Sequence, residues 1–141
     1  MIEITAKPIS PALVIDRVRS DSCGCVVTYV GLIRNTSQDE AVLSVELQDS
    51  EGNAQKILEQ IANEAKQRWL VKKIAISRRV GKLNVGEINQ VVAVASAHRN
   101  EGFATCQHII DQLKERPPTR KVETYKNGNV VVQEAFREAV E

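Results

Sequence analysis

The pattern of hydrophobic and polar positions divides the chain into amphipathic helices and short strands. Apolar residues recur at helical spacing across residues 53–69, which predicts a helix there. The same spacing recurs across residues 103–113, and Pro117 must end that second helix because proline interrupts the helical hydrogen bonds. Ser10 followed by Pro11 is typical of a helix start, so a short helix is expected to run to about Arg19. The predicted buried side of the second long helix comprises Phe103, Cys106, Ile109, Ile110 and Leu113.

Shorter runs of β-branched and alternating apolar residues predict strands between these helices. Residues 90–97 are almost continuously apolar, which indicates a strand buried on both faces. The polar residues 36–40 are expected to form a mobile loop with Arg34 at its entrance. Asn127-Gly128 predicts a hairpin with a type I′ turn, since both residue types tolerate a positive φ. The other strands are expected over residues 2–4, 25–30, 43–47 and 73–79. In the strand over residues 43–47, Leu43, Val45 and Leu47 are expected on one face.

Several of these strands are adjacent in sequence and do not alternate strictly with helices. This order favours an α+β fold over a doubly wound sheet. We expect a single domain over residues 1–141, with mixed or antiparallel sheets, about three helices and a C-terminal β-hairpin, in an α/β-hammerhead-like arrangement.

Composition excludes several classes of function. The chain has 19 basic and 18 acidic side chains, a net charge of +1, so a general binder of nucleic acids or membranes is not expected. The longest apolar run is too short to cross a bilayer and the N-terminus lacks the regions of a secretory signal, so a cytoplasmic location is expected.

No resident cofactor or metal is expected either. The glycines are scattered singly, without a nucleotide-binding loop. Cys23, Cys25 and Cys106 lack the paired spacing of a zinc site or of a disulfide framework, so we expect reduced thiols. The Cys-Gly-Cys turn could hold a metal only if further ligands came from other elements.

The candidate chemistry is concentrated in residues 96–121. His98 and Arg99 follow the buried strand and open a helix, where free backbone N–H groups favour an anion. Lys114 and Lys121 stand at the far end of that helix, separated by two prolines that force the chain to turn. A neighbouring cation lowers the pKa of a lysine and frees its amine for acid, base or nucleophilic chemistry, and Arg116 and Arg120 could act in this way. Ordinary solvated charges are the alternative interpretation for each lysine.

These residues also resemble a known family, the large, catalytic subunit of molybdopterin synthase. The resemblance extends over nearly the whole chain and rests on five segments that follow in the family's order and spacing. They are Gly31–Asn35, Glu64–Trp69, Arg79–Leu83, Ser96–Arg99 and Lys114–Lys121.

The resemblance implies a sulfurtransferase that makes the dithiolene of molybdopterin from cyclic pyranopterin monophosphate. It also implies that the sulfur arrives on the C-terminal Gly-Gly thiocarboxylate of a small ubiquitin-like subunit, and that a homodimer of large subunits forms within a heterotetramer. The catalytic residues implied are Lys114 and Lys121. The implied substrate-binding residues are Leu32, Ile33, Arg34, His98, Arg99, Val122 and Glu123.

The chain departs from the family's pattern at five positions, of which Tyr29, where the family often has phenylalanine, is a mild change. Ser50 and Asn53 replace an aromatic residue and a methionine before the long helix, and Thr119 and Arg120 replace apolar residues before the second lysine. These departures concern the walls that would stack on the pterin or dock the small subunit. A non-catalytic homologue that serves as an anion-binding or scaffold protein is therefore the alternative hypothesis.

Overall fold

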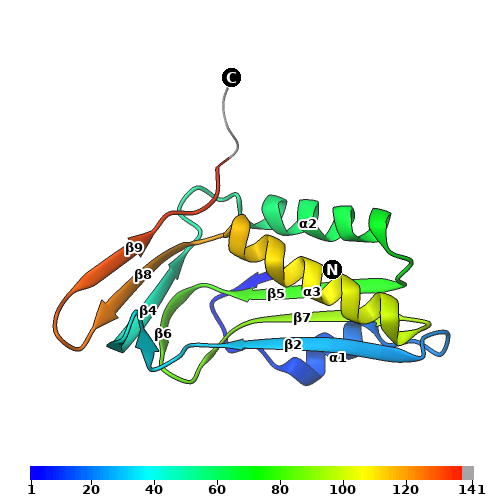
Figure 1. The fold of residues 1–141 in the computed structure, drawn as a ribbon, viewed down its shortest axis with the longest axis horizontal. Helices are drawn as coiled ribbons and strands as arrows, with labels where there is room; N and C mark the ends of the chain where they lie inside the picture. The colour runs from blue at the N-terminus through cyan, green and yellow to red at the C-terminus, as the bar shows by residue number, and fades with distance from the viewer. Residues whose placement is uncertain (138–141) are drawn as a thin grey trace.

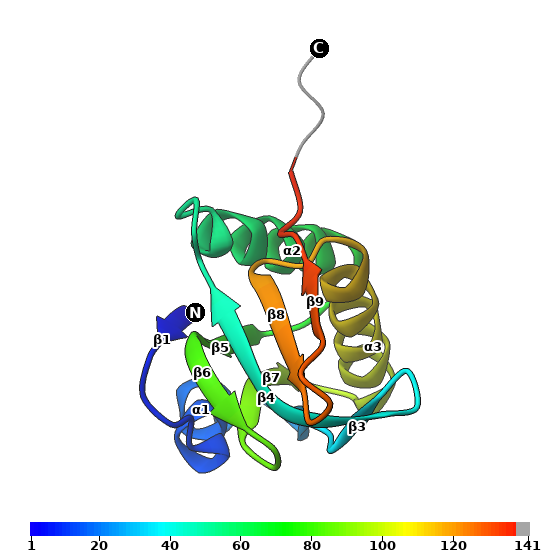
Figure 2. The same ribbon diagram turned by 90° about the vertical axis from the view of Figure 1, so that its left-hand side faces the viewer.

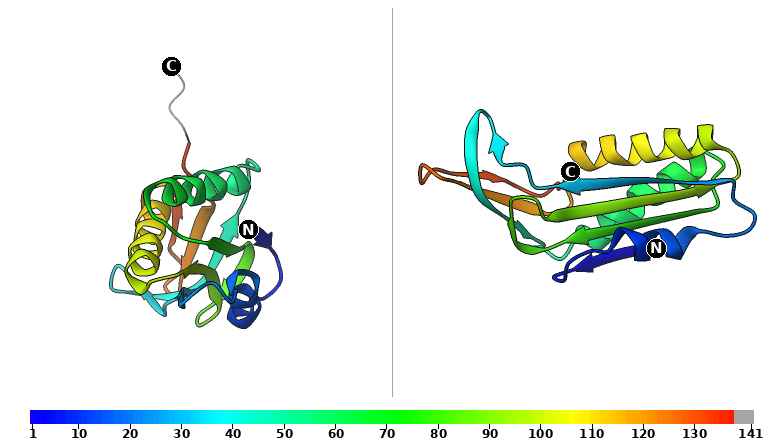
Figure 3. Two further views of the ribbon diagram at one scale, coloured as in Figure 1. Left: turned by 90° about the vertical axis from the view of Figure 1, so that its right-hand side faces the viewer. Right: turned by 90° about the horizontal axis from the view of Figure 1, so that it is seen from below.

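Three helices and two β-sheets make up the computed structural model, which describes residues 1–137 (Figure 1). The first sheet has the strand order β1-β5-β7-β2, with β1 parallel to β5 and the other neighbours antiparallel. Seen from below in Figure 3, β5, β7 and β2 run side by side. The strands of this sheet are β1 (Ile2–Thr5), β2 (Cys25–Leu32), β5 (Lys73–Arg79) and β7 (Ile88–Ser96).

The second sheet lies at one end of the first and faces the viewer in Figure 2. Its order is β3-β4-β8-β9, and β6 pairs with β4; each of these pairs is antiparallel. Its strands are β3 (Thr36–Ser37), β4 (Glu40–Gln48), β6 (Gly81–Asn84), β8 (Arg120–Tyr125) and β9 (Val130–Gln133).

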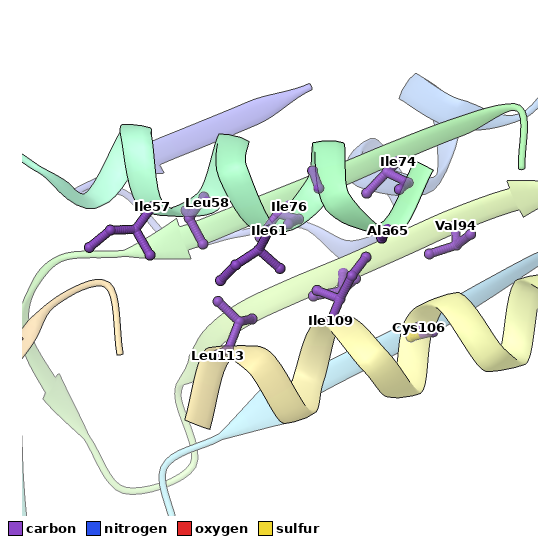
Figure 4. Packing of buried hydrophobic residues seen from close by; sticks show 12 residues of the cluster. Ile57, Leu58, Ile61, Ala65, Ile74, Ile76, Val94, Cys106, Ile109 and Leu113 are labelled. Carbon is purple, nitrogen blue, oxygen red and sulfur yellow. The ribbon is translucent and has the colours of Figure 1, made fainter. Parts of the chain in front are cut away.

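Helices cover both faces of the first sheet. Helices α2 (Ala54–Arg68) and α3 (Arg99–Glu115) pack on one face, and α1 (Pro11–Val18) packs on the other. Every side chain of residues 91–95 on β7 is fully buried, because alternate residues serve the two layers. The sequence-based expectation of a strand buried on both faces is confirmed. The larger core, between α2, α3 and the sheet, is drawn in Figure 4.

The helix predictions are confirmed, apart from one residue. Ser10 caps α1 by accepting a hydrogen bond from the backbone N–H of Leu13 at 3.4 Å. Phe103 was expected on the buried side of α3. This prediction is wrong, since the side chain is 60% exposed. Gly102 occupies the buried face in its place. A Cβ atom there would lie 2.8 Å from Oγ of Ser96 and 3.0 Å from Cγ2 of Val27, so any larger residue would force these side chains to move.

Two strand predictions need correction. The strand expected over residues 25–30 continues to Leu32, with an irregularity at its end. Leu43 was expected inside with Val45, but it is 55% exposed because a register shift between Val42 and Ser44 turns it outward. Strand β6 was not predicted at all.

The turns also differ from expectation. Residues 36–40, expected as a mobile loop, form a short hairpin in which Gln38 and Asp39 have φ values of 50° and 64°. Two consecutive positive φ values are what a type I′ turn requires. The C-terminal hairpin is confirmed, but of Asn127 and Gly128 only Gly128 has a positive φ, so its turn is not type I′. The three-residue loop places glycine alone in the left-handed region.

With these corrections, the α+β fold class predicted from the sequence is confirmed. None of the helices in residues 1–137 combines the length and the hydropathy that crossing a bilayer requires.

Candidate active site

A pocket of about 670 Å³ opens where the two sheets meet. Its walls come from the ends of β2 and β5, the start of β7, the last turns of α3, and strands β4 and β8. Part of the wall is apolar, formed by Val45, Leu47, Ile110 and Leu113. The pocket therefore has an apolar surface beside a charged one.

Positive charge accumulates in this pocket. Of the lining residues within the described part of the chain, four are cations and one is an anion, which gives a local charge of +3 against +1 for the whole chain. The pocket thus attracts anionic ligands although the protein is nearly neutral. The charged lining residues are Arg34, Arg78, Lys114, Lys121 and Glu123.

Both predicted catalytic lysines line the pocket. Lys114 is exposed and stands in the last turn of α3, with no hydrogen bond or ion pair to any of residues 1–137. Lys121 is on β8, its side chain is 38% exposed, and its Nζ atom lies 3.4 Å from Oε1 of Glu123. Pro117 ends the helix and the chain turns back, so the predicted convergence of the two lysines on one pocket is present.

The two arginines expected to perturb these lysines point elsewhere. Arg116 donates two hydrogen bonds to the carboxylate of Glu64 on α2. Arg120 donates to Oε1 of Glu134 at 3.1 Å and to Oε1 of Gln48 at 2.7 Å. Neither arginine lines the pocket, and each is paired with a carboxylate, so neither side chain stands in the pocket beside the lysines. Their expected effect on the lysines stays a prediction.

The segment after β2 contributes its three predicted residues to the pocket. Leu32, Ile33 and Arg34 all line it. Ile33 is buried and anchors the segment through backbone hydrogen bonds with Glu87 and Gly86. Arg34 is exposed and has no partner among residues 1–137, so its charge is available to a ligand.

On β8, only one of the two remaining predicted residues lines the pocket. Glu123 does, and its other oxygen accepts a hydrogen bond from the Tyr125 hydroxyl at 3.3 Å. Val122 does not line it, because adjacent residues of a strand face opposite sides. The positions of Lys121 and Glu123 therefore follow from strand alternation.

His98 and Arg99 lie at the start of α3, as predicted, but far from the lysines of the same chain. The helix has 17 residues, so its two ends are about 26 Å apart. His98 precedes the helix without capping it through its side chain, and both residues are exposed. Within one chain the structure therefore separates the predicted anion contacts into two groups.

Comparison with known proteins bears on this geometry. A family model described as MoaE protein matches residues 4–116. The chain belongs to this family. The molybdopterin synthase catalytic subunit of Thermoplasma volcanium is 35% identical over 128 residues, which are 91% of this chain and 93% of that protein. The family resemblance found in the sequence is therefore confirmed.

Solved structures agree with this assignment. The crystal structure of molybdopterin synthase from Staphylococcus aureus matches with a TM-score of 0.85 and 27% identity, over 93% of this chain and 95% of that one. The complex of subunits 1 and 2 of the molybdopterin-converting factor from Helicobacter pylori matches with a TM-score of 0.73 over 92% of this chain and 88% of that one. At 14% identity this second likeness shows the shared fold alone.

The pocket also contains functional candidates that the sequence analysis missed, above all Arg78 at the end of β5. This side chain is 9% exposed and donates hydrogen bonds to Oε1 of Gln90 at 2.6 Å and to Oγ1 of Thr119 at 3.0 Å. Burial lowers the pKa of its guanidinium to about 10, which leaves it charged at neutral pH. No sequence signal distinguished Arg78 from its neighbour Arg79, which pairs with Glu87 and lies outside the pocket.

None of the three cysteines lines the pocket. Cys106 is buried in the main core, and burial raises the pKa of its thiol to about 11. The pocket's own chemistry is therefore that of lysine, arginine and one carboxylate.

Proposed function

We propose that this protein is the catalytic subunit of a molybdopterin synthase and acts as a sulfurtransferase. In the proposed reaction, the C-terminal thiocarboxylate of a small ubiquitin-like subunit donates sulfur to cyclic pyranopterin monophosphate, and two sulfurs form the dithiolene of molybdopterin. The observation that carries the proposal is the convergence of Lys114 and Lys121 in a pocket of charge +3. The relatives named molybdopterin synthase catalytic subunit support it.

The pocket residues suit this chemistry because both proposed substrates are anions. A thiocarboxylate tail needs its charge held and the charge that develops on its oxygen stabilised. We assign that role to Lys121, which lines the pocket and is held on β8 with its Nζ atom 3.4 Å from Oε1 of Glu123. Lys114 has no carboxylate partner among residues 1–137, and we assign to it the transfer of protons as sulfur enters the pterin.

The proposed assembly is a homodimer of this chain with one small subunit on each copy. Exposed apolar side chains on β2 and β9 support an interface, because a second chain that covers them would remove apolar surface from water. They include Val30 at 38%, Leu32 at 56%, Val130 at 54% and Val132 at 43% exposed. Sedimentation at micromolar concentration should give a dimer, and a monomer would contradict this part of the proposal.

Dimerisation would also give His98 and Arg99 a role. Since one helix length separates them from the lysines of their own chain, we propose that they reach the pocket of the second copy. A His98→Ala/Arg99→Ala chain and a Lys114→Ala/Lys121→Ala chain should each be inactive alone, and their mixed dimer should recover one intact site. A mixed dimer without activity would mean that His98 and Arg99 do not complete the partner's pocket.

Reconstitution tests the function itself. The purified protein, a thiocarboxylated small subunit and the pterin substrate should yield molybdopterin, detected by mass spectrometry. The matched control is the same small subunit with an ordinary carboxylate terminus, which has no sulfur to donate. If no product forms with the thiocarboxylate, the protein is better described as an anion-binding homologue.

A further inference from the structure

Arg78 is a buried cation that has no carboxylate partner among residues 1–137. Two of the five N–H groups of its guanidinium have acceptors, the side chains of Gln90 and Thr119, and both acceptors are neutral. The Nε atom is buried and has no hydrogen-bond partner among residues 1–137. A buried charge of this kind is costly unless something else pairs with it.

The pocket supplies the place for that partner. Arg78, Gln90 and Thr119 all line it, next to Lys114 and Lys121. The carboxylate that lines the pocket, Glu123, is already paired with Lys121. The wall around Arg78 therefore lacks a free negative charge, which an anionic ligand would supply.

We infer that Arg78 binds an oxyanion of the substrate and positions it between its own guanidinium and the two lysines. The inference rests on the proposed function for the identity of the anion, which is either the terminus of the sulfur-donating tail or the phosphate of the pterin. A guanidinium is a planar fork that matches both carboxylate and phosphate oxygens. Because Gln90 and Thr119 hold two of its nitrogen atoms, the fork is fixed in place before the anion arrives.

A structural role is the competing explanation, since Arg78 also links β7 to the segment that precedes β8. The neighbouring Arg79 offers a matched control. It lies on the same strand, its side chain is 11% exposed, and it pairs with Glu87 at 3.1 Å outside the pocket. Arg79→Met should lower the melting temperature and leave ligand affinity unchanged. Arg78→Met should raise the melting temperature and weaken ligand binding, because it removes a buried charge that has no carboxylate partner among residues 1–137.

Calorimetric titration with two probes tests the inference and identifies the anion. The probes are inorganic phosphate and a synthetic peptide that ends in a Gly-Gly carboxylate. Arg78→Met should weaken the binding of one of them at least tenfold, and the probe affected shows whether the phosphate or the tail is held. Arg78→Lys keeps the charge without the fork, so it should weaken the same probe by a smaller factor.

The outcomes separate this inference from the proposed function. Unchanged affinity for both probes in Arg78→Lys and Arg78→Met would overturn the inference, even if the parent protein makes molybdopterin. If Arg78→Met does not fold, an unchanged affinity in Arg78→Lys has the same consequence. A parent protein that makes no molybdopterin but binds a probe through Arg78 would refute the function and leave the anion site standing.

Discussion

Replacing Lys114 by alanine should abolish most of the turnover while leaving the fold intact. The side chain is exposed in the last turn of α3, forms no ion pair within residues 1–137, and lines the pocket. Its removal therefore costs little packing. What it removes from the proposed reaction is a positioned acid-base group and one of the four positive charges of the pocket.

The magnitudes follow from these surroundings. A cation in the last turn of a helix interacts favourably with the helix dipole by about 0.3–1 kcal/mol, so the free energy of unfolding should fall by no more than about 1 kcal/mol. Loss of a positioned acid-base group reduces turnover by about two orders of magnitude or more. A hundredfold reduction corresponds to about 2.7 kcal/mol in the activation free energy.

Lys66 provides the control, because it is also an exposed lysine in the last turn of a helix, α2, and lies outside the pocket. Urea denaturation should give similar stability losses for Lys66→Ala and Lys114→Ala. Single-turnover formation of molybdopterin should be normal in the first variant and at least a hundredfold slower in the second. Equal rates in the two variants would refute the assignment of Lys114 to the chemistry.

Three further changes test the core, a surface ion pair and the proposed anion contact of Arg99 at the start of α3. Ile109→Ala should lower the free energy of unfolding by about 2–5 kcal/mol in urea, because the side chain is fully buried between α3 and the sheet. The hydrogen bonds from Arg116 lower the pKa of Glu64 from 4.5. This pair therefore stabilises the fold above about pH 4.5, and the stabilisation is lost as the pH falls through the lowered pKa. Glu64→Gln should show a shallower acid-induced loss of stability than the parent. Arg99→Ala should weaken pterin binding by about 1.5–3 kcal/mol in calorimetry, and an unchanged dissociation constant would remove Arg99 from the site.

The sequence was sufficient to predict features that depend on local periodicity. The helical spacing of residues 53–69 and the continuous apolar run of residues 91–95 each correspond to an element of the expected type. Pro117 and the strand that follows it explain why two lysines from one continuous segment converge. Those features are set by nearby residues, so nearby residues reveal them.

Features that depend on distant partners could not be predicted in this way. Strand β6 forms only because β4 offers an edge, and Leu43 faces outward only because of a register shift against β8. Arg78 and Arg79 are adjacent and chemically identical. Their different surroundings are set by Thr119, in the segment before β8, and Glu87, in the turn before β7.

The pairing of arginines across the fold distinguishes the candidate site from the rest of the surface. Within residues 1–137, six arginines form ion pairs with carboxylates and Arg68 lies over the ring of Trp69. The three arginines with neither kind of partner are Arg34, Arg78 and Arg99, and each is a candidate for anion binding. The ion-paired arginines are Arg17, Arg19, Arg79, Arg116, Arg120 and Arg137. Two of these three arginines, Arg34 and Arg78, line the pocket. The third, Arg99, lies at the start of α3, which is proposed to complete the pocket of a second copy.

If Arg78 is left unpaired in order to bind a ligand, then giving it an internal carboxylate should block the site. Gln90→Glu is the least disruptive way, because Oε1 of Gln90 already lies 2.6 Å from Nη1 of Arg78. The stronger charged hydrogen bond offsets the burial of the new carboxylate, so the free energy of unfolding should stay within about 1 kcal/mol of the parent. Affinity for the probe that Arg78 binds should fall at least tenfold. Gln48→Glu is the matched control, since Gln48 accepts from Arg120 at 2.7 Å outside the pocket, and it should leave that affinity unchanged. Parent affinity in a folded Gln90→Glu protein would show that the anion does not need the guanidinium of Arg78.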